Sequence, residues 1–262
     1  MKKLGVIGGM GPEATSLYYA KVIEWTNATR DQEHIDMVIL SHASMPDRTE
    51  AILTGQTSAF LQAIKEDVEA LEQMGVANIA VPCNTSHSFL REIQNMTRVP
   101  VIDMVKEGVR CIQGRHPDVR KVGILATDGT IRSGLYQHAC TEAGIEAAVP
   151  DTQAQRAVMS LIYDDIKGGR YIEDGKFYQA YRSLMAQGCG AALLACTELS
   201  IYKECSSVPE NCIDAMDALV QESILRSGAQ LREGGGRLDR RRPKGAPQYV
   251  CFTQEGLVRR AE

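Results

Sequence analysis

The stretch Ile79-Ala80-Val81-Pro82-Cys83-Asn84-Thr85-Ser86-His87 places a cysteine and several polar residues directly after a short apolar run. Later in the chain, Leu193-Leu194-Ala195-Cys196-Thr197-Glu198-Leu199 repeats this arrangement. A short apolar run bounded by polar residues is typical of a buried strand in a parallel sheet. We therefore predict that each cysteine lies where a buried strand ends and a helix begins.

Apolar runs alternate with helical patterns along most of the chain. The expected buried strands cover residues 3–7, 36–40, 77–81, 121–126, 191–195 and 209–213. The expected helices cover residues 12–23, 57–74, 86–95, 153–167, 173–187 and 215–226, with further helices that end near 113 and include Tyr136. This alternation predicts an α/β protein in which helices cover both faces of mainly parallel sheets.

The chain also repeats its own order. Gly5-Val6-Ile7 and Gly123-Ile124-Leu125 begin two similar segments, and each continues through a threonine to a tyrosine. We predict two pseudo-symmetric three-layer α/β/α domains, with the following bounds: 1–100 for the first, 101–214 for the second, and a helix at 215–227 that packs back on the first. Because ligands of open parallel sheets bind at the carboxyl ends of strands, the site is expected in the cleft between the domains.

The segment 228–262 differs from the rest of the chain. It contains Glu233-Gly234-Gly235-Gly236-Arg237 and Arg240-Arg241-Arg242-Pro243-Lys244-Gly245, which show no apolar periodicity. Residues 229–262 hold eight Lys/Arg and four Asp/Glu. We interpret the segment as a disordered basic tail, with a basic interaction arm as the alternative.

Composition sets limits on partners and location. The net charge of −4 over 262 residues gives no reason to expect nucleic acid or a membrane surface as a partner. The apolar run behind Met1-Lys2-Lys3 is too short for a signal peptide, and no segment approaches the length of a membrane-spanning helix. We therefore expect a cytoplasmic protein whose eight cysteines are reduced thiols. No Cys-x-x-Cys pair is present, so no metal site is expected.

Cys83 and Cys196 have the setting of reactive thiols. A helix N-terminus stabilises a thiolate, and Asn84, Thr85 and Thr197 supply groups that cap a helix or bind a carboxylate. The other cysteines are expected to be small buried apolar residues: Cys111, Cys140, Cys189, Cys205 and Cys212. Two thiols that face each other across a cleft suit one task, in which one takes a proton from carbon and the other returns a proton from the opposite side.

Five separated motifs resemble the aspartate/glutamate racemase family, over about residues 3–227. They are Gly8-Gly9-Met10-Gly11-Pro12-Glu13-Ala14-Thr15, Pro46-Asp47-Arg48-Thr49, Pro82-Cys83-Asn84-Thr85-Ser86-His87, Ala126-Thr127-Asp128-Gly129-Thr130 and Ala195-Cys196-Thr197-Glu198-Leu199. The resemblance implies a cofactor-independent amino-acid racemase with two α/β domains and a cysteine from each. It also implies a homodimer that acts on a small amino acid.

The resemblance assigns roles to particular residues. Cys83 and Cys196 would be the acid/base pair, and Arg48 and Lys167 would bind the side-chain carboxylate of an acidic amino acid. The remaining substrate-binding candidates are Met10, Asn84, Thr85, Thr127, Thr130 and Thr197. His87 and Glu198 are candidates for tuning the two cysteines. Glutamate-specific racemases carry histidine at the position of Glu198, so the resemblance favours the aspartate type, although glutamate stays a possible substrate.

Other functions are compatible with parts of the sequence. Hydantoin racemases and broad-specificity or neutral amino-acid racemases also keep two cysteines, and maleate isomerases and arylmalonate decarboxylases share the scaffold but use cysteine differently. A nucleotide-binding oxidoreductase would need the spacing G-x-G-x-x-G, which Gly8-Gly9-Met10-Gly11 lacks. A redox sensor, in which Cys83 and Cys196 form a switch disulfide, is a non-catalytic alternative.

Overall fold

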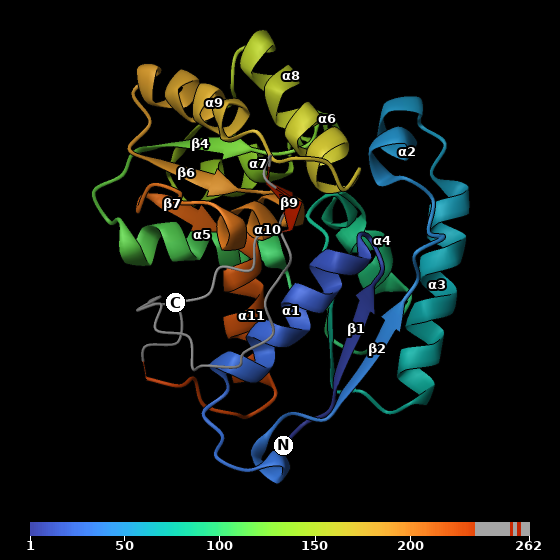
Figure 1. The fold of residues 1–262 in the computed structure, drawn as a ribbon. Helices are drawn as coiled ribbons and strands as arrows, with labels where there is room; N and C mark the ends of the chain where they lie inside the picture. The colour runs from blue at the N-terminus through green and yellow to red at the C-terminus, as the bar shows by residue number, and fades with distance from the viewer. Residues whose placement is uncertain (234–251, 254–255, 258–262) are drawn as a thin grey trace.

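The computed structural model describes residues 1–233, 252–253 and 256–257. Two α/β halves lie side by side, one built around β1 and β2 and the other around β4, β6 and β7 (Figure 1). Most of the predicted disordered tail lies outside the described residues. Of its described part, β8 (Phe252–Thr253) and β9 (Gly256–Leu257) form a short antiparallel pair.

The first half contains a parallel sheet of three strands in the order β2-β1-β3. A bridge between Ile79 and Val101 continues it beyond β3. The strands are β1 (Leu4–Gly8), β2 (Met37–Ser41) and β3 (Asn78–Ala80). The helices are α1 (Pro12–Trp25), η1 (Asp31–Glu33), α2 (Arg48–Thr54), α3 (Ser58–Gln73), η2 (Thr85–Phe89) and α4 (Leu90–Asn95).

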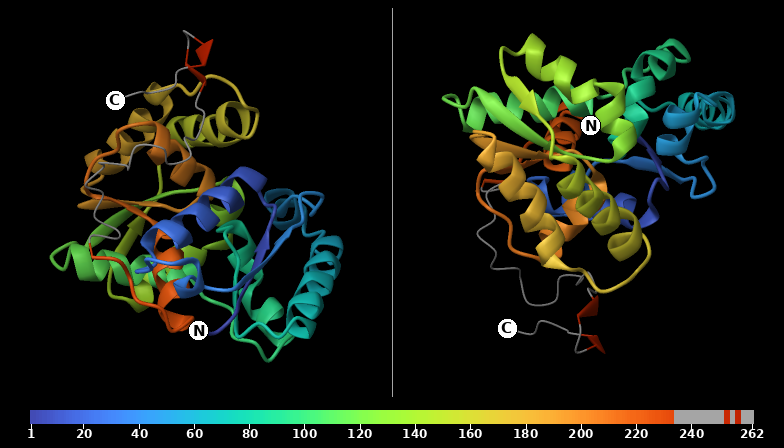
Figure 2. Two further views of the ribbon diagram at one scale, coloured as in Figure 1. Left: turned by 60° about the horizontal axis from the view of Figure 1, so that its bottom comes forward. Right: turned by 90° about the horizontal axis from the view of Figure 1, so that it is seen from above.

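Alternate residues of β1 face the helices on opposite sides of this sheet. Leu4 and Val6 pack in the core that includes α1, whereas Ile7 packs in a second cluster with Phe60 and Ile64 of α3. Successive side chains of a strand point to opposite faces, so a continuous apolar strand needs a cover on both sides. The views in Figure 2 show the helices on both faces of the strands.

The second half contains a parallel sheet of four strands in the order β5-β4-β6-β7. The strands are β4 (Lys121–Leu125), β5 (Glu146–Ala148), β6 (Ala191–Leu194) and β7 (Cys212–Asp214). The helices are α5 (Met104–Arg115), α6 (Asp128–Ser133), α7 (Leu135–Glu142), α8 (Thr152–Ser160), the π-helical η3 (Leu161–Ile166), α9 (Asp174–Ala186), α10 (Thr197–Cys205) and α11 (Ala215–Arg226).

The two sheets have equivalent topology. β1 and β4 are flanked by the next strand along the chain on one side and by the third strand, β3 or β6, on the other. β3 leads to Cys83, and β6 leads to Cys196. The predicted α/β class with parallel sheets is therefore confirmed, and the two cysteines follow corresponding strands.

The two halves share one apolar core. It runs from Leu4 and Val6 of the first sheet to Leu193 and Leu194 of the second. Helix α11 contacts α1 and β3 of the first half as well as α5 and β7 of the second. The continuous core fixes the carboxyl ends of both sheets relative to each other.

An ionic cluster with few exposed atoms reinforces this contact. Lys21 of α1 lies 2.7 Å from Asp217 of α11 and 3.0 Å from Glu204 of α10. Lys203 lies 2.6 Å from the other carboxylate oxygen of Asp217. The ammonium groups of Lys21 and Lys203 hold the pKa of Asp217 below its ordinary value, although burial alone would raise it.

Several elements differ from the prediction. Strand β5 was not predicted, because its sequence Glu146-Ala147-Ala148 carries no apolar alternation. Helix α2 was not predicted, although Asp47 is a typical N-cap residue and its carboxylate accepts from Glu50 N at 2.8 Å. The helix expected at 86–95 is divided into η2 and α4.

The start of the predicted tail is ordered in the described part. Leu231 forms an antiparallel bridge with Thr26, and Arg232 N donates to Trp25 O at 2.8 Å.

Cys205 is disulfide-bonded, which corrects the expectation that all eight cysteines are reduced. Among the described helices, none is both long and apolar enough to cross a bilayer.

Candidate active site

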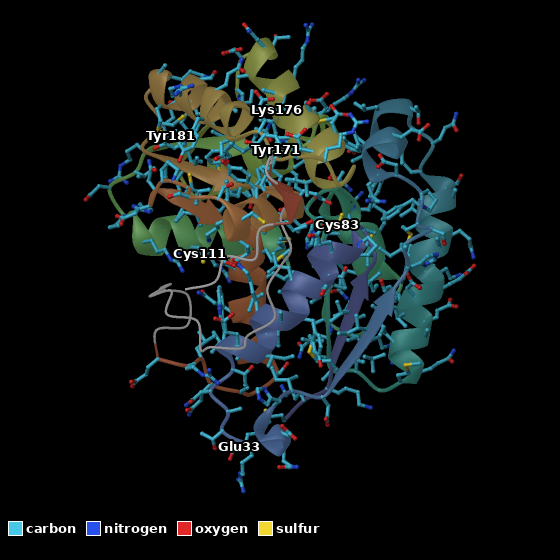
Figure 3. The ribbon with its side chains drawn as sticks, in the orientation of Figure 1. Glu33, Cys83, Cys111, Tyr171, Lys176 and Tyr181 are labelled. Carbon is cyan, nitrogen blue, oxygen red and sulfur yellow. The ribbon has the colours of Figure 1, made fainter. Side chains whose placement is uncertain are left out.

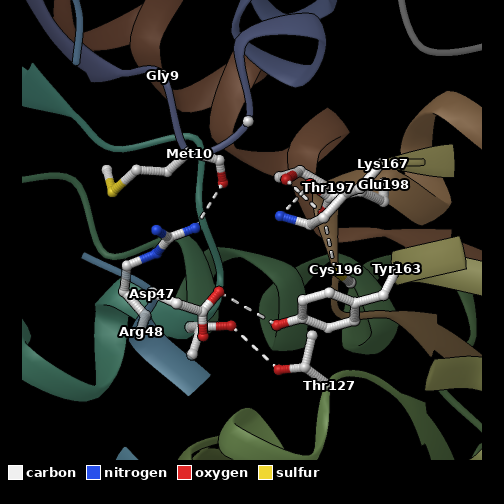
Figure 4. Close-up of polar contacts among 12 residues, drawn as sticks. Gly9, Met10, Asp47, Arg48, Thr127, Tyr163, Lys167, Cys196, Thr197 and Glu198 are labelled. Carbon is white, nitrogen blue, oxygen red and sulfur yellow. Dashed lines mark hydrogen bonds and ion pairs between the residues drawn. The ribbon is translucent and has the colours of Figure 1, made fainter. Parts of the chain in front are cut away.

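The loop between β1 and α1 brings its main chain to the junction of the two halves. Gly9 has φ of 88°, and a Cβ there would lie 2.4 Å from the main chain of His42, so the turn requires glycine. Pro12 then occupies the first turn of α1. The loop places the carbonyl of Met10 above the site, where it accepts a hydrogen bond from Arg48 Nη2 at 3.4 Å (Figure 4).

Cys83 and Cys196 line one narrow pocket between the halves. Cys83 lies where the two halves meet (Figure 3). The pocket is also lined by Met10, Asp47, Arg48, Thr49, Asn84, Thr85, Thr127, Tyr163, Lys167, Thr197 and Glu198. The structure therefore brings together both cysteines and most of the predicted substrate-binding residues.

Cys196 has an acidic neighbour. It is the N-cap residue of α10, and its Sγ donates to Glu198 Oε2 at 2.9 Å. The other carboxylate oxygen of Glu198 pairs with Lys167 Nζ at 3.0 Å (Figure 4). Burial and the Glu198 carboxylate raise the pKa of the Cys196 thiol well above its usual range, and Lys167 opposes them.

Cys83 has a basic neighbour. Its helix is only the five-residue η2, so the expected strong dipole of an α-helix is missing beside this thiol. Arg48, which is 8% exposed, supplies positive charge instead. Burial would lower the pKa of Arg48, but interaction with Cys83 and then Asp47 raises it overall.

Arg48 is held rigidly in this position. Its Nη1 donates to Met45 O at 3.3 Å and to Pro46 O at 3.0 Å. Its Nε has no hydrogen-bond partner among the described residues. A buried guanidinium with an unused donor is suited to binding an anionic group of a ligand.

A group of hydroxyl and amide donors lies on the other side of the pocket. Tyr136 donates its hydroxyl hydrogen to Asn84 Oδ1, which fixes the orientation of this amide. Asn84 Nδ2 is buried without a partner among the described residues. Thr85 Oγ1 lies 3.2 Å from Thr127 Oγ1 and 3.0 Å from Thr130 Oγ1. These groups can present several hydrogen bonds to a carboxylate.

Two predicted residues lie behind the lining. Thr130 is not part of it and instead fixes the hydroxyls of Thr85 and Thr127. His87 is also absent from the lining: its Nδ1 lies 2.9 Å from Cys83 O, and its Nε2 accepts from Met104 N at 3.2 Å. Its ring holds the main chain that carries Cys83.

The pocket is also lined by Tyr163, Thr49 and Asp47, to which the sequence analysis assigned no role. Tyr163 lies 3.4 Å from Asp47 Oδ2 across the pocket (Figure 4), and burial raises its pKa to about 12. Tyr163 stands four residues before Lys167 on the same helical face, a spacing that could have identified it.

A larger and more open pocket adjoins the first one. It shares Met10, Arg48 and Lys167 with the smaller pocket. It is further lined by Ile166 of η3 and by residues of α1 and α10, among them Glu13. Burial and the nearby Glu198 raise the pKa of Glu13. This outer pocket leaves room beyond Lys167 for a group larger than a short side chain.

Fold and site define a class, the two-domain α/β proteins that bring one cysteine from each half to a shared pocket. Residues 7–223 match the family model described as Asp/Glu/hydantoin racemase. The chain therefore belongs to this racemase family and is an isomerase.

Individual relatives agree with this assignment. The broad-specificity amino-acid racemase of Bacillus subtilis is 29% identical over 225 residues, which is 84% of this chain and 96% of that protein. A glutamate racemase of Picosynechococcus is 26% identical over 171 residues, 61% of this chain and 57% of that protein. Among solved structures, aspartate racemase of Picrophilus torridus has a TM-score of 0.74 and 27% identity, with 91% of this chain and 100% of that chain covered.

Proposed function

We propose that the protein racemises an amino acid, with aspartate as the first candidate substrate, through proton transfer at Cα between two cysteines and without a cofactor. The observation that carries the proposal is that Cys83 and Cys196 follow corresponding strands of the two halves and line the same pocket. One thiolate removes the α proton, and the thiol on the other side donates a proton to the resulting carbanion. The bond to hydrogen is thereby re-formed with the opposite configuration.

The donor group around Asn84 supports binding of the α-carboxylate. Asn84 Nδ2 and the hydroxyls of Thr85 and Thr127 belong to buried residues, where hydrogen bonds to a charged ligand are strong. Thr197, at the start of α10, adds a hydroxyl beside Cys196. Delocalisation of the carbanion into a carboxylate held in this way lowers the barrier to proton removal.

Arg48 and Lys167 support aspartate as the substrate. Both cationic groups line the pocket, and a dicarboxylic amino acid brings a second carboxylate that they can bind. The similarity to aspartate racemase of Picrophilus torridus is consistent with this choice. Glutamate is one methylene longer and brings the same two carboxylates.

A broad-specificity amino-acid racemase is the second candidate. Lys167 is already paired with Glu198 at 3.0 Å, so less positive charge is left for a second carboxylate. The outer pocket, which opens beside Lys167, leaves room for longer side chains. The similarity to the broad-specificity racemase of Bacillus subtilis favours the same possibility.

Incubation in heavy water tests the function directly. The protein is supplied with L-aspartate, L-glutamate, L-alanine, L-lysine or a 5-substituted hydantoin, without pyridoxal phosphate, and α-deuteration and the second enantiomer are measured. We expect the highest rate with aspartate, and Cys83→Ser and Cys196→Ser should each lower it by about 10²–10⁴-fold. Absence of α-deuteration with every substrate would refute the function, and full activity of either variant would refute the two-cysteine mechanism.

A further inference from the structure

Glu198 makes two contacts that together fix its carboxylate beside Cys196. The residue is 4% exposed, with Oε2 at 2.9 Å from Cys196 Sγ and Oε1 at 3.0 Å from Lys167 Nζ. A carboxylate accepts hydrogen bonds and does not donate them, so the short contact requires the hydrogen to be on sulfur. The geometry therefore describes Cys196 as a thiol whose S–H points toward Glu198.

The surroundings of Cys83 have the opposite charge. Arg48 interacts with Cys83, whereas the Glu198 carboxylate contacts Cys196 Sγ. A nearby cation favours a thiolate, and a nearby anion disfavours it. The two cysteines occupy equivalent positions in the fold but are not equivalent electrostatically.

We propose that Glu198 is a positioning residue that holds the S–H of Cys196, and thereby assigns Cys196 the role of the acid, with Cys83 as the partner thiol. The proposal deepens the proposed racemisation and depends on it only for its consequence in catalysis. In the turnover that starts from this arrangement, Cys83 acts as the thiolate and takes the α proton, and the Cys196 S–H proton moves to the carbanion. The cysteines then exchange protonation states, and proton exchange with solvent restores the resting form.

Other ionisable groups that face Cys196 do not replace Glu198. Tyr136 on α7 and Tyr163 on η3 interact with this thiol, but burial keeps both phenols neutral at physiological pH by raising their pKa. The ammonium of Lys167 opposes the effect of Glu198 on the pKa of Cys196, and it pairs with the other oxygen of Glu198. Removal of the Glu198 charge should therefore lower the pKa of Cys196.

Site-resolved alkylation tests this inference without requiring racemase activity. Wild-type protein and Glu198→Gln are treated with iodoacetamide between pH 7 and pH 9, and the peptide that contains Cys196 is quantified by mass spectrometry. A nearby charge shifts a pKa by about 1–3 units, and each unit of decrease raises thiolate tenfold while lowering its nucleophilicity about threefold. We expect alkylation of Cys196 to be roughly 3- to 40-fold faster in Glu198→Gln.

Two further variants keep the test decisive. Glu66→Gln removes an exposed carboxylate of α3, a helix that does not line the pocket, and it should leave the alkylation rate of Cys196 at the wild-type value. Glu198→Asp keeps the charge but moves it away from Sγ, so Cys196 should be alkylated faster than in the wild type and more slowly than in Glu198→Gln. This variant carries the test if Glu198→Gln fails to fold. Wild-type rates in both Glu198 variants would overturn the proposal.

The pH profile of racemisation supplies the second measurement. If Cys196 is the acid, the alkaline limb of kcat/KM reports loss of its proton, so Glu198→Gln should move this limb to lower pH. Because the equilibrium constant of racemisation is one, the limb must move equally for both enantiomers. If Cys196 is alkylated faster in Glu198→Gln but the wild-type protein shows no racemase activity, the role of Glu198 stands and the proposed function is rejected. If the protein is active but the alkaline limb is the same in the wild type and Glu198→Gln, Glu198 does not set the acid.

Discussion

The buried ionic cluster between the halves gives a quantitative prediction of stability. Lys21 is 3% exposed and lies 2.7 Å from Asp217 and 3.0 Å from Glu204. Replacement of Lys21 by methionine keeps much of the side-chain volume but leaves buried carboxylates with less countercharge. Loss of one partner of a buried ion pair costs about 3–5 kcal/mol, so we expect the free energy of unfolding to fall by this amount.

Thermal and urea denaturation at pH 7 measure this loss. At about 2–4 °C per kcal/mol for a chain of this size, the expected decrease in Tm is roughly 6–20 °C. Lys65→Met is the matched control, because Lys65 and Glu69 are 3.6 Å apart with both side chains 52% exposed. Such an exposed pair contributes about 0.3–0.5 kcal/mol. Equal losses in the two variants would refute the stabilising role of the buried cluster.

The pH dependence of the same measurement has a definite sign. The pKa of Asp217 is lowered in the folded protein, so its stabilisation is complete above the unfolded value of about 3.9 and disappears as pH falls toward the folded value. Lys21→Met removes part of the cause of that lowering. The difference in stability between wild type and variant should therefore shrink when the pH is lowered below about 4. A constant difference across this range would exclude Asp217 as the origin.

Two other variants test substrate recognition. Arg48→Ala should lower kcat/KM for L-aspartate about 10- to 100-fold more than for L-alanine, because a charge-assisted hydrogen bond contributes about 1.5–3 kcal/mol. Equal losses of kcat/KM for the two substrates in steady-state assays would show that Arg48 does not recognise the side chain. Tyr163→Phe removes the 3.4 Å contact with Asp47 across the pocket. We expect KM to rise about 2- to 10-fold for every substrate with little change in kcat, and an unchanged KM in the same assays would show that this contact does not support binding.

The sequence alone determined the fold class and the positions of the two cysteines. Apolar runs such as Ile79–Val81 and Leu193–Ala195 are sufficient to predict buried strands, because continuous apolar segments need cover on both faces. Because the two halves of the sequence repeat the same order of strands and helices, Cys83 and Cys196 were predicted to follow corresponding strands. The strand β5 was beyond this reasoning, because two alanines and a glutamate give no periodic signal.

Only the tertiary structure decided how the pocket is charged. Lys167 was predicted to bind the substrate, and the fold in addition places its ammonium 3.0 Å from Glu198, 31 residues away along the chain. His87 directs both ring nitrogens to the main chain, and Tyr163 reaches Asp47 from the opposite half. Such contacts depend on distances between separate elements, which hydrophobic periodicity does not encode. The sequence therefore identified two equivalent thiols and placed Glu198 two residues after one of them, whereas the fold brought Arg48 to Cys83 and Lys167 to Glu198.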